Sequence, residues 1–149
     1  PDIYRYYKRK KNILLRNPKS TRPWQHVLEP LSGYLKLAEK IHKMRKNDKI
    51  LNWNFGPNIS SCKSVFYIVK YLSKYLNLKI NYLKESSKIF KPETTFLRLS
   101  NFKAKRLLKW KPKWSLNKSL DKTYEWNNGV SKKNALKKCY DQIENYFGK

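Results

Sequence analysis

The sequence predicts an α/β fold for this chain. Short strand-like runs and longer helix-like stretches alternate along its 149 residues, which is the pattern of that class. A content of 40% hydrophobic and 15% aromatic residues is enough for a packed core and excludes a disordered basic tail. The chain has only 4 glycines and no Gly-x-Gly-x-x-Gly run, so it lacks a dinucleotide-binding fingerprint and a P-loop. Because the strands are few and short, we do not expect a complete doubly wound domain.

The first third of the chain predicts a helix end, a strand, a turn and a long helix. Residues 1–11 mix aromatic and basic side chains as the end of a helix does, and the apolar run at 12–16 predicts a strand. Residues 17–26 form a basic turn. Apolar residues at helical spacing predict a helix from residue 29 to about residue 46, and Pro30 suits its first turn.

The remainder of the chain continues the alternation of strands and helices. Residues 49–55 alternate as a strand does, and Ser60 or Ser61 is expected to cap a helix that carries Val65 and Leu76. The later elements are expected, in chain order, as a strand at 79–83, a polar loop at 84–94, a strand at 95–99, a helix at 102–108 capped by Ser100 or Asn101, a stiff connector at 110–114, and helices at 115–126 and 133–147.

The net charge of +25 has two interpretations. Lysine and arginine number 35 against 10 acidic residues, and such an excess is typical of proteins that bind nucleic acid or another polyanion. The excess is spread over every predicted element, however, which favours a drift of composition toward lysine. Tyr67, Tyr71 and Tyr75 share one helix face at a spacing of four residues, which favours a packed stripe over a platform for stacked bases. Nucleic acid is therefore not the partner that we expect.

Several classes of site and location are disfavoured by the residues present. No apolar run is long enough to predict a membrane span. The two isolated cysteines do not combine with the two histidines into a metal-ligand pattern, and they favour a reduced, cytoplasmic protein. The acidic residues show no pairing that suggests acid–base catalysis, and there is no Gly-x-Ser-x-Gly elbow. The residues therefore predict a binding surface and no catalytic or metal site.

The basic turn is the strongest candidate for ligand binding. Arg22 follows a predicted strand and precedes a predicted helix, where a guanidinium and a helix N-terminus can both face a phosphate. Trp24 and His26 are placed to orient a ligand or the start of the helix. The alternatives for these three residues are a solvated arginine, a packed tryptophan and a histidine that bonds to local backbone.

One run of the chain closely resembles the motif of the CDP-glucose 4,6-dehydratases, which are extended short-chain dehydrogenases/reductases. The run is Arg22-Pro23-Trp24-Gln25-His26-Val27-Leu28-Glu29-Pro30-Leu31, preceded by Arg16-Asn17-Pro18. Other nucleotide-sugar enzymes carry a looser form of it, Arg-Asp-Trp/Tyr-x-x-Val-x-Asp, whose last Asp stands at the position of Glu29. Similar segments follow in order at 53–57, 97–99 and 108–114. Ser100 and Lys109 depart from the family pattern, which usually has Asp and Gly at these positions.

The resemblance implies a fold and a domain organisation. Residues 1–149 would form part of the C-terminal substrate-binding lobe of an extended short-chain dehydrogenase/reductase, and the chain would lack the Rossmann core. The NAD-binding domain and the catalytic residues would lie in an absent N-terminal half. Such a lobe is expected to expose the apolar patch that this half covers. The intact protein is expected to be a homodimer, and this chain alone is expected to be inactive.

The resemblance also implies an activity and roles for individual residues. An NAD-dependent lyase would convert CDP-glucose to CDP-4-keto-6-deoxyglucose plus water, in the biosynthesis of deoxysugars and O-antigen. Arg22 would grip the diphosphate, and Arg98 would assist at the phosphates. The strand edge beside the nucleotide would be formed by Leu14, Leu15 and Arg16, and the turn would be shaped by Trp24 and His26. Two alternatives stay open, a dehydratase or epimerase of another nucleotide sugar and a polyanion-binding module.

Overall fold

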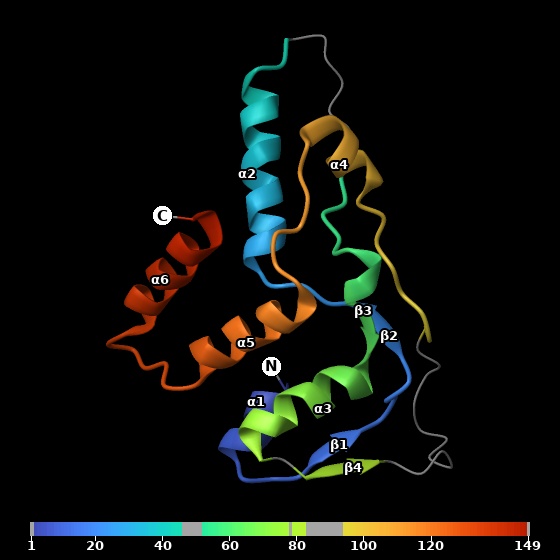
Figure 1. Cartoon of the computed structure of the whole chain (residues 1–149), viewed down its shortest axis with the longest axis vertical. Coiled ribbons are helices and arrows are strands. Elements are labelled where there is room, and N and C mark those ends of the chain that lie inside the picture. The colour runs from blue at the N-terminus through green and yellow to red at the C-terminus, as the bar shows by residue number, and fades with distance from the viewer. Residues whose placement is uncertain (1, 46–51, 78, 83–93, 149) are drawn as a thin grey trace. The chain divides into compact units, whose positions relative to one another are not determined.

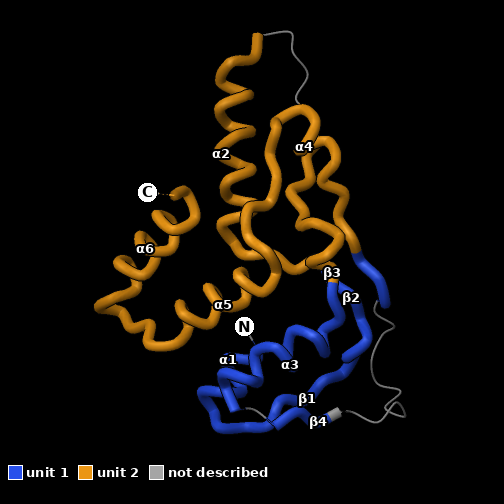
Figure 2. Tube along the Cα trace, viewed as in Figure 1, with its two compact units in different colours: residues 1–22, 63–97 blue, residues 23–62, 98–149 orange. Residues whose placement is uncertain are grey.

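The computed structural model describes residues 2–45, 52–77, 79–82 and 94–148 (Figure 1). Helices and short strands alternate, so the predicted α/β class is confirmed. The chain divides into two compact units (Figure 2). Unit 1 comprises Pro1–Arg22 and Lys63–Leu97, and unit 2 comprises Pro23–Cys62 and Arg98–Lys149.

Unit 1 is built on a pair of parallel strands with two helices. Its elements are α1 (Asp2–Lys8), β1 (Ile13–Leu15), α3 (Val65–Leu76) and β4 (Ile80–Tyr82). β1 pairs with β4 so that Ile13 lies opposite Ile80. The core of this unit contains the buried side chains of Ile13, Leu15 and Val69, so the apolar run that predicted β1 also anchors it. The strands predicted at 12–16 and 79–83 are therefore confirmed.

The residues between β1 and α2 differ from the sequence prediction. Thr21–Pro23 form a strand, β2, that pairs with β3 (Cys62–Ser64), whereas the sequence predicted only a turn there. The cap of α3 was also predicted wrongly. Ser64 is the N-cap, and its hydroxyl accepts a hydrogen bond from the backbone N–H of Tyr67 at 3.2 Å. The residues predicted to cap this helix lie in a 3-10 turn, η1 (Ile59–Ser61).

Unit 2 contains the two longest of the described helices and two of the buried clusters. Its helices are α2 (Leu28–His42), α4 (Phe102–Leu108), α5 (Leu116–Asn127) and α6 (Ala135–Phe147). One cluster joins Leu28, Trp114 and Tyr146. The other joins Phe55, Ala104 and Trp110. The connector between α4 and α5 thus supplies one buried tryptophan to each cluster.

Two predicted strands are absent from the described residues. The 95–99 run makes only an isolated parallel bridge, between Phe96 and Thr21. Residues 52–55 of the predicted 49–55 strand are in no strand, and 46–51 lie outside the described residues, as do 83–93 of the predicted 84–94 loop. Both runs have alternating apolar residues, but a strand also needs a neighbour with which to pair.

Two residues around α4, Ser100 and Lys109, differ from the motif that the sequence resembles. Lys109, the C-cap of α4, has φ +51°, a left-handed conformation that favours glycine. The amide of Asn101 donates to the carbonyls of Gly56 and Pro57 at 2.9 and 3.1 Å, and does not cap the helix as predicted. Ser100 Oγ instead accepts from the N–H of Phe102 at 3.4 Å. The helix therefore forms although Ser100 and Lys109 depart from the pattern of the family that the sequence resembles.

Candidate functional site

Arg22 lies in β2 and is held by backbone carbonyls within unit 1. Its Nη1 donates to the carbonyl oxygen of Thr94 at 2.7 Å and to that of Thr21 at 3.0 Å. A guanidinium has five N–H donors in a planar fork, and these two bonds are made by one nitrogen. Fixing the side chain in this way reduces the rotamer entropy that an arginine loses when it binds a phosphate.

The turn that precedes Arg22 is fixed by backbone hydrogen bonds to two segments distant in sequence. Val65 donates to the carbonyl of Ser20, and Phe66 to that of Pro18, both at 2.9 Å. On the other side, Thr21 donates to Thr95 at 2.8 Å and accepts from Leu97 at 3.1 Å. These bonds satisfy the backbone of the turn and hold Arg22 at its end.

The residues predicted to form the strand edge lie on and after β1. Leu15 is buried in the core of unit 1, whereas Leu14 is 43% exposed. Arg16 follows the strand and is exposed. The alternation of buried and exposed side chains is that of a strand with one packed face, so Leu14 and Arg16 have the accessible positions.

In unit 2, the turn enters α2 through Trp24, Gln25 and His26. Trp24 is half-buried and its backbone N–H donates to the carbonyl of Ser61 at 3.4 Å. The Gln25 amide donates to the carbonyl of Phe55 at 2.8 Å. These contacts tie the turn to residues 55–61, so its shape depends on tertiary contacts as well as on local sequence.

His26 is a buried histidine that caps the first turn of α2. Its Nδ1 accepts a hydrogen bond from the backbone N–H of Leu28 at 3.3 Å, and its ring lies 4.9 Å from that of Trp114. Burial lowers the pKa of His26 below 6.5, while the charge of Glu29 and a hydrogen bond with Gln142 act in the opposite direction. The neutral ring therefore takes the place of a side-chain cap, which Val27 at the N-cap does not provide.

Glu29 is buried in the first turn of α2, with only 1% of its surface exposed. Its carboxylate accepts from the backbone N–H of Lys113 at 3.0 and 3.2 Å, from that of Trp114 at 2.8 Å, and from the hydroxyl of Tyr146 at 2.7 Å. A buried charge is tolerated when its lone pairs are used in this way. Glu29 thus joins α2 to the 110–114 connector and to α6.

Ser32 and Tyr146 extend this network. Ser32 Oγ donates to the carbonyl of Glu29 at 2.7 Å, accepts from the indole N–H of Trp110 at 2.9 Å, and lies 3.1 Å from the hydroxyl of Tyr146. Burial is the main cause that raises the pKa of Tyr146, so the phenol stays protonated and donates to Glu29. Four side chains thus connect three elements through satisfied hydrogen bonds.

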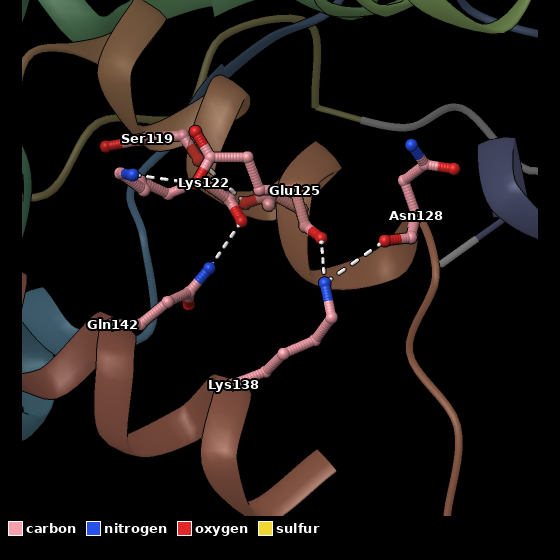
Figure 3. Close-up of polar contacts among 7 residues, drawn as sticks. Ser119, Lys122, Glu125, Asn128, Lys138 and Gln142 are labelled. Atoms are coloured by element: carbon pink, nitrogen blue, oxygen red, sulfur yellow. Dashed lines mark hydrogen bonds and ion pairs between the residues drawn. The ribbon is translucent and has the colours of Figure 1, made fainter. Parts of the chain in front are cut away.

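Contacts between α5 and α6 hold the helix that carries Tyr146 (Figure 3). Lys138 Nζ donates to the carbonyls of Glu125 and Asn128 at 2.9 and 3.2 Å, which satisfies groups at the end of α5. The amide of Gln142 donates to the carbonyl of Lys122 at 2.6 Å. Because Gln142 also bonds to His26, α5 and α6 are connected, within unit 2, to the residue that caps the first turn of α2.

The structure distributes the seven predicted site residues over both units. Arg22, Leu14, Leu15 and Arg16 belong to unit 1, and Trp24, His26 and Arg98 belong to unit 2. Arg98 is in the exposed run at 94–100. Within unit 2, His26 and Trp24 lie in the same short turn, as predicted. Among the described residues, no group of histidine, cysteine or acidic side chains could hold a metal ion, and no helix there is long and apolar enough to span a membrane.

Sequence reasoning did not identify the network around Glu29. The sequence predicted for Glu29 only a favourable position at the N-terminal end of a helix. The hydrogen-bond partners of Glu29 are 84 to 117 residues away in the chain, so no local pattern contains them. One signal was present, since the looser motif of other nucleotide-sugar enzymes also has an acidic residue at this position. His26 matches the alternative of a histidine that bonds to local backbone.

Comparison with known proteins gives a relative by sequence. No protein-family model matches the chain. CDP-glucose 4,6-dehydratase from Salmonella typhimurium (strain LT2) is 35% identical over 128 residues, which covers 85% of this chain and 35% of that enzyme. The chain therefore spans about a third of the length of the curated relative that it matches.

Solved structures give the fold. UDP-glucuronic acid 4-epimerase from Bacillus cereus, solved in complex with UDP-glucuronic acid and NAD, superposes with a TM-score of 0.67 at 19% identity, over 87% of this chain and 39% of that protein. RMD from Pseudomonas aeruginosa, solved with NADPH, has a TM-score of 0.60 at 16% identity, over 80% of this chain and 37% of that protein. The chain is thus related to CDP-glucose 4,6-dehydratase over a third of that enzyme's length, and it has the fold of the C-terminal part of extended short-chain dehydrogenases/reductases.

Proposed function

We propose that residues 1–149 form the nucleotide-sugar-binding lobe of a CDP-glucose 4,6-dehydratase. The observation that carries the proposal is the 35% identity to that enzyme over 128 residues, together with the Arg22–Leu31 motif. The reaction would convert CDP-glucose to CDP-4-keto-6-deoxyglucose plus water in a soluble, cytoplasmic homodimer. Its product would enter deoxysugar biosynthesis.

We assign the binding of the diphosphate of the nucleotide sugar to Arg22. The carbonyls of Thr21 and Thr94 hold its side chain, and an oriented guanidinium binds phosphate oxygens through parallel N–H bonds. Leu14, Leu15 and Arg16 would line the nucleotide from the edge of β1, and Arg98 would add positive charge. Trp24 and His26 would maintain the turn and make no direct contribution to the chemistry.

The described residues contain no glycine-rich loop of the kind that binds the pyrophosphate of NAD. Gly33 lies inside α2 and Gly56 lies against Leu99, while Gly129 and Gly148 stand at isolated positions with open space around them. No two of these glycines form a loop that could approach a pyrophosphate closely. We therefore assign NAD to a domain outside this chain, and we expect the 149-residue chain alone to have no dehydratase activity. Turnover of CDP-glucose by the chain alone would overturn this division of roles.

Another nucleotide sugar is the alternative that the fold supports. UDP-glucuronic acid 4-epimerase, solved with UDP-glucuronic acid, has the same fold over 87% of this chain, and this supports the alternative. A polyanion-binding module has one structural observation in its favour. On α3, Tyr67 and Tyr71 stack with their rings 6.4 Å apart, and Lys74 lies 5.8 Å from the Tyr71 ring. The rings stack on one another, however, and this is the arrangement of a packed stripe.

Competition among free nucleotides tests the proposal. In the protein that contains this chain and the segment encoded in frame before Pro1, CDP should displace a fluorescent CDP analogue at lower concentration than UDP, GDP or dTDP. Arg22→Ala should weaken CDP binding by about 2 kcal/mol, roughly thirtyfold, because it removes charge-assisted hydrogen bonds. Arg9→Ala, at an exposed position after α1, is the matched control and should bind as the parent does. Stronger binding of another nucleotide would reject CDP-glucose as the substrate.

A further inference from the structure

The turn between α5 and α6 contains the one Asn-Gly pair of the sequence, Asn128–Gly129. In such a pair the backbone nitrogen of the glycine can attack the side-chain amide carbon of the asparagine, because the glycine has no Cβ to block the approach. Both residues are exposed to solvent. Within the part of the chain that the structure describes, the N–H of Gly129 donates to no other residue, so its nitrogen is available to react.

The backbone around this pair leaves room for a ring to close. Asn128 is the C-cap of α5 with φ −83° and ψ 108°, so its Cα–C bond has to rotate before the nitrogen of Gly129 reaches Cγ. Gly129 has φ +80°, and no heavy atom lies within 4 Å of the position that a Cβ would take there. The side-chain amide of Asn128 makes a long, exposed hydrogen bond to the hydroxyl of Tyr124, at 3.3 Å. Neither the backbone nor this weak contact prevents the rotation.

Lys138 of α6 places a positive charge on the peptide group that would react (Figure 3). Its Nζ donates to the carbonyl oxygen of Asn128 at 3.2 Å and to that of Glu125 at 2.9 Å. The carbonyl of Asn128 and the N–H of Gly129 belong to the same peptide group, so negative charge that forms on the nitrogen is shared with this oxygen. A cationic donor at the oxygen stabilises that charge, as the donors of an oxyanion hole do. The flexible stem of Lys138 lets Nζ follow the oxygen when the Cα–C bond rotates.

We propose that Asn128 is a site of spontaneous deamidation and that Lys138 promotes the reaction. The nitrogen of Gly129 loses its proton to solvent and bonds to Cγ of Asn128. The Cγ–Nδ2 bond breaks, and the amide nitrogen takes a proton from water and leaves as ammonia. Water then opens the cyclic imide at one of its two carbonyl carbons. Attack at Cγ gives aspartate at position 128, and attack at the backbone carbon, whose oxygen Lys138 binds, gives isoaspartate. The contact with Lys138 therefore favours isoaspartate.

The modification changes the junction between α5 and α6. In isoaspartate the chain runs through the side-chain carbons, so the connection is longer by one methylene group and the former backbone carbonyl becomes a carboxylate. That carboxylate pairs with Lys138. An ordinary aspartate at position 128 instead adds a negative charge at the C-terminus of α5, which the helix dipole disfavours. Because α6 carries Tyr146, the modified turn is connected to the helix that donates to Glu29.

Peptide mass spectrometry of the protein that contains this chain tests the site. Trypsin cleaves after Lys122 and Lys132, so one peptide carries both Asn128 and Asn127. Asn127 ends α5, its side chain donates to the carbonyl of Thr123 at 2.8 Å, and no glycine follows it, so it is an internal control. During incubation in mildly alkaline buffer we expect Asn128 to gain the mass of an OH group in exchange for NH₂, while Asn127 stays intact. Methylation by an isoaspartyl methyltransferase measures the isoaspartate, which should be the main product.

Substitutions at Lys138 test its part in the reaction, and they lie outside the peptide that is measured. Lys138→Met should slow deamidation by roughly three- to tenfold, which is the range that one hydrogen bond supplies, and should lower the share of isoaspartate. Lys138→Arg keeps a cationic donor and should keep both. Lys137→Met, at the neighbouring exposed position of α6, removes the same charge and is the matched control, which should react as the parent does.

Two results would overturn the inference. A rate in Lys138→Met that equals or exceeds that of the parent would show that the contact with the Asn128 carbonyl does not promote the reaction. The free peptide of residues 123–132 gives the second comparison. If Asn128 stays intact in the folded protein under conditions in which this peptide deamidates, the turn protects the asparagine and is no site of modification.

Discussion

Glu29 is the residue on which the packing of unit 2 depends most strongly. Its carboxylate satisfies two backbone N–H groups and one hydroxyl, from the connector and from α6. Glu29→Ala leaves these three donors without an acceptor in a buried site, and we expect it to lower the free energy of unfolding by about 3–5 kcal/mol. Urea denaturation of the protein measures this.

Two variants control the Glu29 experiment. Glu29→Gln keeps the shape and one acceptor oxygen and should lose clearly less stability than Glu29→Ala. Glu39→Ala, at an exposed position of α2, should be close to neutral. If Glu29→Ala and Glu39→Ala have the same stability, the network does not hold α6 to α2.

His26 makes the stability of the fold depend on pH. Burial lowers its pKa in the folded state below the value of 6.5 that it has when unfolded. As the pH falls below 6.5, His26 therefore binds a proton more readily in the unfolded state than in the folded state, and the folded state loses stability. The contribution of His26 to the stability of the fold is complete above pH 6.5, and it decreases as the pH falls toward the lowered pKa of His26 in the folded state. We expect the free energy of unfolding, measured in urea between pH 8 and pH 5, to fall over this window.

Replacement of His26 measures how much this residue contributes to the decrease in the free energy of unfolding between pH 8 and pH 5. His26→Asn should be less stable at pH 8, because the ring packs on Trp114, but its stability should change less between pH 8 and pH 5. His42→Asn, at the exposed end of α2, should retain the pH dependence of the parent. An unchanged pH dependence in His26→Asn would show that other groups cause it.

At the scale of single residues, local chemistry could be predicted from the sequence and long-range partners could not. The locally bonded histidine and the packed tryptophans follow from residue type and spacing, because their partners or their burial are typical of those residues. The role of Glu29 depends on residues at 113, 114 and 146, and no local pattern contains that information. The assignment of Arg22 to a phosphate stays a prediction.

At the scale of elements, the helices were predicted better than the strands. Helical spacing within one run was sufficient for α2, α3 and α5, with boundaries shifted by a few residues. A strand depends also on its neighbour, and β2 was missed because β3 lies about forty residues later in the chain. The 95–99 run was predicted as a strand for the same reason, since alternation alone does not reveal that only one bridge forms.

The end of α4 allows a prediction at this scale. Lys109 has φ +51° at the C-cap, where a side chain with a Cβ costs about 1–2 kcal/mol relative to glycine. Lys109→Gly should therefore raise the midpoint of thermal unfolding, by a stabilisation of about 1 kcal/mol after the greater backbone entropy of glycine is subtracted. Lys111→Gly in the neighbouring connector is the control and should not stabilise. A lower midpoint for Lys109→Gly would contradict the assigned backbone conformation.

At the scale of the whole molecule, the α/β class and the C-terminal lobe of an extended short-chain dehydrogenase/reductase could both be predicted from the sequence. The class followed from the alternation of elements and the lobe from one specific motif. The division into two units could not be predicted, because its boundary falls inside that motif, between Arg22 and Pro23. The partition of the enzyme into this lobe and an NAD-binding domain stays a proposal.

The net charge of +25 gives a prediction for the molecule as a whole. Evenly spread lysines attract any polyanion at low salt, and salt at about 0.15 M screens charges beyond about 8 Å. We expect duplex DNA to bind weakly at low salt and to be released near physiological salt, irrespective of sequence. Fluorescence anisotropy with two unrelated duplexes measures this, and tight binding that persists at that salt concentration would favour the polyanion-binding module.

The hydrogen bond from Tyr146 to Glu29 also has a consequence for the order in which the protein is made. The two residues are 117 positions apart in the chain. During synthesis the N-terminal part of unit 2 leaves the ribosome long before its carboxylate has all its donors. A chain that stops before residue 146 would therefore contain almost all of unit 2 and would still leave a buried carboxylate without one of its donors.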